Sequence, residues 1–189
     1  MVQQDEQTQQ ALSYMRHQGA KSIADLAALM ERTAFDCARC LEGISEEQAS
    51  FKPALSRSPE RSEGVAEGAG EEWSVKEVLG HMLVSGAGVN REVANLVAGQ
   101  PPVQEARMGV VAGADRPIDE LRRRLAELWA ETARLVATLP EEGSVERTWE
   151  HPLFGPLNSK EWIAFQRIHA LDHVQQIEQI KAAPSYPKS

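Results

Sequence analysis

Apolar residues recur every three or four positions along four long stretches of the chain, which is the period of an amphipathic helix. The first stretch runs from about residue 22 to 41 and is followed by Gly43, a residue typical of helix C-termini. The others cover about 74–98, 117–139 and 158–182. Because no convincing strand pattern accompanies them, the chain is predicted to be an all-α, four-helix bundle.

Capping residues support these boundaries. A capping box is predicted wherever a serine or asparagine precedes a glutamate or glutamine by three positions, as in Ser45/Gln48, Ser74/Glu77 and Asn158/Glu161. Between the third and fourth helices, residues 147–157 are interrupted by prolines and a glycine. This segment predicts a small hairpin or an irregular corner before the last helix.

The segments outside the helices define the domain organisation. Residues 1–21 are polar and glutamine-rich and are predicted to be an N-terminal extension, with a short helix around 9–17. Residues 54–71 are rich in Gly, Ser, Glu and Arg and predict a mobile surface loop. A single bundle domain is therefore expected over residues 22–183, with a tail at 184–189.

Composition and charge narrow the class of partner. The 189 residues carry a net charge of −8 at pH 7, which argues against binding to nucleic acid or to an anionic membrane. No apolar run reaches the roughly 20 residues that span a bilayer, and the N-terminus lacks a basic-then-apolar signal region. A cytoplasmic protein acting on a small molecule is expected.

The two cysteines form a C-x-x-C pair, Cys37 and Cys40. Redox chemistry of the thioredoxin type needs the first thiol at a helix N-terminus, but Cys37 falls well inside an apolar-periodic helix. A zinc site would need two more ligands nearby. Buried structural thiols are the favoured interpretation, and redox or metal use is the alternative.

The strongest chemical signal is the pair His169 and His173, four residues apart in the last predicted helix. Four steps of about 100° bring the two imidazoles onto one face, one turn apart, where both can bind one metal ion. Their face also carries Trp162, Gln166 and Gln176, so we expect it to point into the protein.

A third ligand is available on the second long helix. His81 lies at the edge of that helix's apolar stripe and can reach into the bundle from its margin. One histidine facing an i,i+4 pair on another helix is a recurring three-nitrogen metal site, and such sites keep an open position for water or substrate. The alternative is three histidines that only fill the core or its edge.

In order and spacing, these residues resemble the DinB-like superfamily of four-helix-bundle metalloenzymes. The resemblance covers about residues 22–182 and has three parts: residues 41–53, residues 72–82 (Glu-Trp-Ser-Val-Lys-Glu-Val-Leu-Gly-His-Met), and residues 151–162 (His-Pro-Leu-Phe-Gly-Pro-Leu-Asn-Ser-Lys-Glu-Trp) followed by His169-x-x-x-His173-x-x-Gln176. It implies a bundle with a long crossover in place of simple up-down connections. It also implies a divalent metal, usually Zn²⁺ or Ni²⁺, at His81, His169 and His173, and pairing into a homodimer.

Four further residues are candidates for roles around the metal. Gln176, one turn beyond His173, is either a structural amide or a hydrogen-bond partner of a ligand imidazole or of a substrate. Ser85 and Gly88 follow His81 on its own face, where they either open space for substrate or allow close helix contact. His151, in the corner segment, is expected to be solvated.

Two functions from different classes follow. The first is a metal-dependent enzyme, a transferase or hydrolase, that activates a water or a low-molecular-weight thiol; relatives in the superfamily include thiol S-transferases and a thiol-dependent isomerase. The second is a non-catalytic, stress-related binding or dimerisation module whose metal is structural or absent. Metal identity, substrate and reaction are not encoded in any motif of this sequence.

Overall fold

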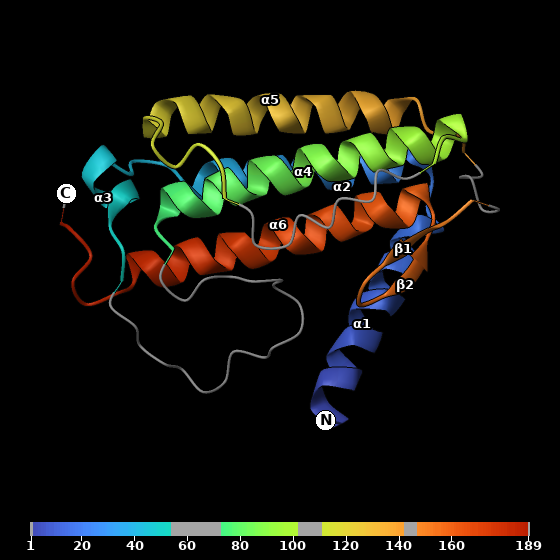
Figure 1. Cartoon of the computed structure of the whole chain (residues 1–189), viewed down its shortest axis with the longest axis horizontal. Coiled ribbons are helices and arrows are strands. Elements are labelled where there is room, and N and C mark those ends of the chain that lie inside the picture. The colour runs from blue at the N-terminus through green and yellow to red at the C-terminus, as the bar shows by residue number, and fades with distance from the viewer. Residues whose placement is uncertain (1, 54–72, 102–110, 142–146, 189) are drawn as a thin grey trace.

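Helices make up most of the structure. The computed structural model describes residues 2–53, 73–101, 111–141 and 147–188 (Figure 1). In chain order the elements are α1 (Val2–Gly19), α2 (Ile23–Cys40), α3 (Glu46–Ser50), α4 (Val75–Ala98), α5 (Ile118–Ala137), the strands β1 (Trp149–His151) and β2 (Gly155–Leu157), and α6 (Ser159–Lys181). The all-α prediction is confirmed.

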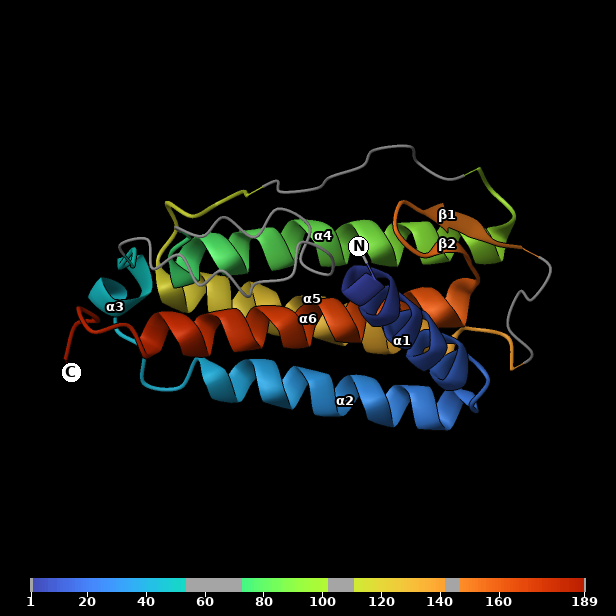
Figure 2. The ribbon, with the colours of Figure 1, turned by 90° about the horizontal axis from the view of Figure 1, so that it is seen from below.

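The four long helices α2, α4, α5 and α6 form the bundle. Helix α2 packs against α5 and α6, and α4 packs against the same two helices, so α2 and α4 lie on one diagonal. Helices α4 and α5 run in one direction and α2 and α6 in the other (Figure 1, Figure 2). Since α4 and α5 are parallel, Ala98 and Ile118 lie at opposite ends of the bundle, so the connection between them is the expected long crossover.

The helix starts follow the predicted capping signals. Ser45, Ser74 and Asn158 are the N-caps of α3, α4 and α6, and each forms a complete capping box with the residue three positions later. Each such cap is worth about 1 kcal/mol of stability, because it satisfies backbone N–H groups that have no partner inside the helix. Helix α4 ends at Gly99, whose φ of 69° is in the left-handed region favoured by glycine.

The core lies between the four long helices. Leu79 of α4, Leu121 of α5, and Ile163 and Ile177 of α6 are all fully buried and belong to one apolar cluster. Burying side chains of this size contributes about 1.5–3 kcal/mol each to folding. Among the described residues, no helix combines the length and the apolar character needed to cross a bilayer.

The N-terminal segment forms a longer helix than the short one expected around 9–17. Helix α1 covers Val2–Gly19 and lies across α6 (Figure 2). Met15 of α1 is fully buried, and the Arg167 guanidinium of α6 donates from Nε to the Tyr14 hydroxyl at 3.2 Å. The sequence of α1 is only weakly amphipathic, so the apolar period did not predict a helix of this length. Few apolar residues are needed in α1, because one buried turn against α6 is enough to dock it.

The corner before α6 is the predicted hairpin. Strands β1 and β2 are antiparallel, with Trp149 opposite Leu157 and His151 opposite Gly155. The indole rings of Trp149 and Trp162 stack at 4.5 Å between centroids, so the hairpin packs against the first turn of α6.

The predicted mobile loop at 54–71 lies outside the described residues. In the C-terminal tail, Tyr186 packs edge-on against Phe51 at 5.6 Å.

Candidate metal centre

Three imidazoles meet between α4 and α6. Nε2 of His169 lies 3.1 Å from Nε2 of His81 and 3.2 Å from Nε2 of His173. All three residues offer a ring nitrogen within 4.8 Å of the other two, a spacing that could hold one metal ion. The structure therefore brings together the three residues that the sequence analysis selected.

Antiparallel packing of α4 and α6 produces this meeting. His81 lies near the start of α4, whereas His169 and His173 lie in the middle of α6, so two helices that run in opposite directions bring them level. Gly80 contributes in a way that sequence analysis missed. A Cβ on Gly80 would lie 2.4 Å from the carbonyl oxygen of Ala112, so glycine lets the segment before α5 pass directly over α4 beside His81.

Gln176 sets the tautomer of the His173 imidazole. The amide Oε1 of Gln176 lies 2.9 Å from Nδ1 of His173, and an amide oxygen can only accept a hydrogen bond. Nδ1 of His173 therefore carries the proton, and its Nε2 presents a lone pair to the other two imidazoles. A carboxamide or carboxylate behind a metal-binding imidazole acts in the same way, because it sets the tautomer and the ring orientation.

Burial keeps the imidazole of His169 neutral. His81 and His173 are 2% and 1% exposed, and His169 is half-buried. Desolvation, reinforced by the neighbouring His173, His81 and His151, holds the pKa of His169 well below its ordinary value. His169 is therefore neutral at physiological pH, the form in which imidazole binds metal.

The donor set fits a divalent cation. Nitrogens bound to one tetrahedral zinc ion are about 3.3 Å apart, close to the two observed Nε2 separations. Without a cation, the lone pair on Nε2 of His173 would face Nε2 of His169 in a buried site. Such a contact is unfavourable unless a proton lies between the two nitrogens. Three imidazoles also leave a tetrahedral ion with one open position, the arrangement found in catalytic zinc sites.

Aromatic side chains border the three rings. The ring of Trp73 is 5.1 Å from that of His81, and the ring of Phe165 is 5.8 Å from that of His169. Trp73 directly precedes the capping box of α4. Apolar walls exclude water and lower the local dielectric constant, which strengthens electrostatic interactions inside the site.

The prediction that His151 is solvated is wrong. The hairpin folds its ring onto α6, where it is 4% exposed and packs against Phe165 at 4.5 Å and Trp162 at 5.2 Å. Its Nδ1 accepts a hydrogen bond of 3.1 Å from the backbone N–H of Leu153, so its proton lies on Nε2. Burial lowers the pKa of His151 to about 4.

Ser85 and Gly88 have different surroundings. The Ser85 hydroxyl donates to the carbonyl oxygen of His81 at 2.9 Å, a bond within its own helix. A Cβ on Gly88 would meet no atom within 4 Å, so close helix contact does not explain this glycine. The tight contact is at Gly86, where a Cβ would lie 2.6 Å from Cδ2 of Leu128 and 3.2 Å from Nε2 of Gln166. That the space at Gly88 admits substrate stays a prediction.

The two glycines provide a paired stability test. Gly88→Ala should raise the free energy of unfolding by about 0.5–1 kcal/mol, because alanine suits a helix better and nothing obstructs its methyl group. Gly86→Ala should lower it by about 1–3 kcal/mol, because Leu128 must move. Urea unfolding of both variants beside the wild type measures the difference; shifts in the same direction would contradict the contacts described at Gly86.

The cysteines are not part of this centre. Cys37 and Cys40 are free, buried thiols on α2. Burial raises the pKa of Cys37 to about 12 and that of Cys40 to about 11, so neither is a thiolate at neutral pH. These properties favour structural thiols, because redox and metal chemistry both use the thiolate.

Comparison with known proteins places the chain among related sequences. The DinB superfamily matches over residues 29–177, which includes all three histidines. The chain is also similar to the uncharacterized protein YuaE of Bacillus subtilis (strain 168), with 25% identity over 158 residues, covering 75% of this chain and 88% of YuaE.

Proposed function

The chain belongs to the DinB superfamily, and on that basis we propose that it is a metal-dependent enzyme that binds one divalent ion through His81, His169 and His173. The convergence of the three Nε2 atoms carries this proposal. Zn²⁺ and Ni²⁺ are the expected ions, since imidazole nitrogen suits both. A bound divalent ion lowers the pKa of a water or thiol that coordinates it.

The protein's own groups prepare the site for that chemistry. Gln176 holds His173 with its lone pair directed at the other rings, and burial keeps His169 neutral. The rings of Trp73 and Phe165 pack beside His81 and His169 and give the site apolar borders, which disfavour bulk water. Because the chain supplies three donors, one coordination position is left for a small molecule.

Transfer of a low-molecular-weight thiol to an electrophile is the reaction that we propose. In this reaction the thiol sulfur forms a bond to an electrophilic carbon, the leaving group departs with its electron pair, and the thiol proton passes to solvent. The protein's cysteines are poor candidates for the sulfur, because burial keeps Cys37 and Cys40 protonated. The thiol must therefore come from a co-substrate.

Metal analysis followed by chelation tests the proposal. We expect one tightly bound ion per chain in the purified protein, and a helical fold by circular dichroism after the ion is removed. Thiol conjugation to a small electrophile should be fast in the metal-loaded protein and absent in the chelated one. Unfolding on chelation would favour a structural metal, and a metal-free, inactive protein would favour a binding or dimerisation module.

Gln176→Met should weaken metal binding about 10- to 100-fold, the usual effect of losing a hydrogen-bond partner of a ligand imidazole. Methionine fills a similar volume but cannot accept the Nδ1–H of His173. Competition with a chromogenic chelator measures the affinity. Gln175→Met, at an exposed position on the same turn of α6, is the control and should bind metal like the wild type.

A further inference from the structure

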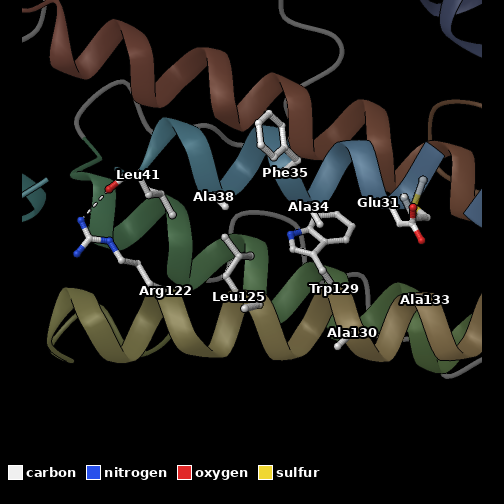
Figure 3. A pocket seen from close by; sticks show the side chains of 12 residues that line it. Glu31, Ala34, Phe35, Ala38, Leu41, Arg122, Leu125, Trp129, Ala130 and Ala133 are labelled. Carbon is white, nitrogen blue, oxygen red and sulfur yellow. Dashed lines mark hydrogen bonds between the residues drawn. The ribbon is translucent and has the colours of Figure 1, made fainter. Parts of the chain in front are cut away.

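An apolar groove lies between α2 and α5, on helices other than the two that carry the metal centre. Its volume is about 500 Å³, and its walls come from both helices (Figure 3). A cavity of this size is in the range of small-molecule sites, which are mostly apolar and carry few polar groups. Five alanines keep the groove open, namely Ala34 and Ala38 of α2 and Ala126, Ala130 and Ala133 of α5.

One polar group of this groove has no hydrogen-bond partner in the part of the chain that the structure describes. Trp129 lines the groove and is 6% exposed, and its indole Nε1 is buried and unpaired. Figure 3 shows the nitrogen edge of the ring turned along the groove towards Leu125. Buried N–H groups nearly always have a partner in folded proteins, so this donor marks a place for an acceptor.

The Cys37 thiol is the protein group nearest to being that acceptor. Burial raises the pKa of this thiol, and the N–H of Trp129 lowers it to a lesser extent, so the two groups are close. Sulfur is only a weak acceptor, however, and the N–H does not form a hydrogen bond with it. An oxygen acceptor supplied by a ligand would satisfy the indole better.

The charged groups at the two ends of the groove favour an uncharged ligand. The Arg122 guanidinium, at one end, pairs with the Asp119 carboxylate at 2.7 Å. It also donates to the carbonyl oxygens of Leu41 at 2.7 Å and Ile44 at 2.6 Å, so it is already engaged and does not need an anion. Glu31, at the other end, is exposed, and its negative charge would repel an anion (Figure 3).

The dimensions of the groove favour a flat molecule over a helix. Its length along α5, from Arg122 to Ala133, is about 16 Å at a rise of about 1.5 Å per residue. Spread over that length, the volume corresponds to a cross-section about 6 Å wide. A helix with its side chains is about 10–12 Å in diameter and does not fit, whereas a planar ring system does.

We propose that the groove binds a neutral, flat, largely apolar molecule whose ketone or ester oxygen accepts a hydrogen bond from Nε1 of Trp129. Apolar contact with the walls supplies most of the affinity, and the hydrogen bond discriminates against hydrocarbons of the same shape. Phe35, which also lines the groove and is 64% exposed, offers its ring to the same molecule. The site takes no part in the proposed metal chemistry, so the two proposals can fail independently.

Fluorescence titration with a naphthyl ketone dye tests the site. Propionyl-dimethylaminonaphthalene is neutral and flat, and its emission shifts to the blue when it leaves water. We expect one saturable site per chain with a dissociation constant of about 10–200 μM, the affinity of a ligand with fewer than about 20 heavy atoms. The affinity should be the same after chelation of the metal. The absence of saturable binding, or binding that is lost with the metal, would overturn the proposal.

Trp129→Phe tests the hydrogen bond. The variant loses the N–H and keeps an aromatic ring, so the ketone should bind about 2- to 10-fold more weakly, the usual effect of losing one hydrogen bond. The propyl analogue of the dye, which lacks the carbonyl oxygen, should bind the wild type and the variant equally. An equal loss for both dyes would mean that the indole acts only through its shape. That result, or an unchanged affinity for the ketone, would overturn the proposed contact.

Filling the groove tests its location. Ala38→Leu combined with Ala130→Leu adds a large side chain to each wall at an exposed position, and should weaken both dyes at least about 10-fold. Ala94→Leu combined with Ala137→Leu, at exposed positions outside the groove, is the matched control and should bind like the wild type. Urea unfolding checks that both variants are folded. Unchanged binding in the filled variant would overturn the proposal. Wild-type affinity that falls as the protein concentration rises would also overturn it, because another copy of the chain would then cover the groove.

Discussion

Replacing His169 with alanine is expected to reduce the bound divalent metal from one ion per chain to none detectable after desalting. Nε2 of His169 is the nitrogen that lies next to both of the others, at 3.1 and 3.2 Å. Without it, His81 and His173 provide two donors on different helices. We expect the affinity to fall by at least about 10³-fold, more than the 10- to 100-fold that follows loss of a residue behind a ligand.

Elemental analysis and thermal unfolding with added metal measure this effect. A ligand at 100 times its dissociation constant stabilises the folded protein by about 2.7 kcal/mol, so metal should raise the melting temperature of the wild type but not that of His169→Ala. His17→Ala, which removes an exposed imidazole of α1, is the control and should behave like the wild type. Full metal content in His169→Ala with a native far-UV spectrum would contradict the proposed ligand set.

Acid is expected to destabilise the wild type more than a His151→Phe variant. Burial lowers the pKa of His151 from 6.5 to about 4, so between these values the unfolded chain binds a proton that the folded chain does not. The unfolded state is therefore favoured as the pH falls. A difference of about 2.5 pKa units corresponds to about 3 kcal/mol in the free energy of unfolding. This contribution is fully present above pH 6.5 and is lost as the pH falls towards 4.

His151→Phe removes this proton-linked loss and keeps an aromatic ring among Trp162 and Phe165. At pH 7 it should cost about 1 kcal/mol, because the N–H of Leu153 loses its hydrogen bond to Nδ1. Between pH 7 and pH 4, however, the wild type should lose about 3 kcal/mol more than the variant. Urea unfolding at several pH values, with chelator present, gives both numbers. Parallel stability curves would mean that His151 is solvated in the folded protein.

The sequence alone determined the local structure. The 3.6-residue period placed the four long helices, and the capping boxes at Ser45, Ser74 and Asn158 marked where α3, α4 and α6 begin. It also placed His169 and His173 on one face of α6, because residues four apart on a helix are always neighbours. These features depend on contacts between residues close in the chain, which sequence patterns report directly.

Tertiary structure decided everything that depends on contacts between distant residues. Only the antiparallel packing of α4 on α6 brings His81 to 3.1 Å from His169, although family resemblance anticipated the meeting. Burial of His151 and the tight space at Gly86 both depend on what another element places against them, the hairpin on α6 and Leu128 of α5 respectively. No local pattern encodes such contacts, because they are set by how the helices pack and not by the period of any one of them.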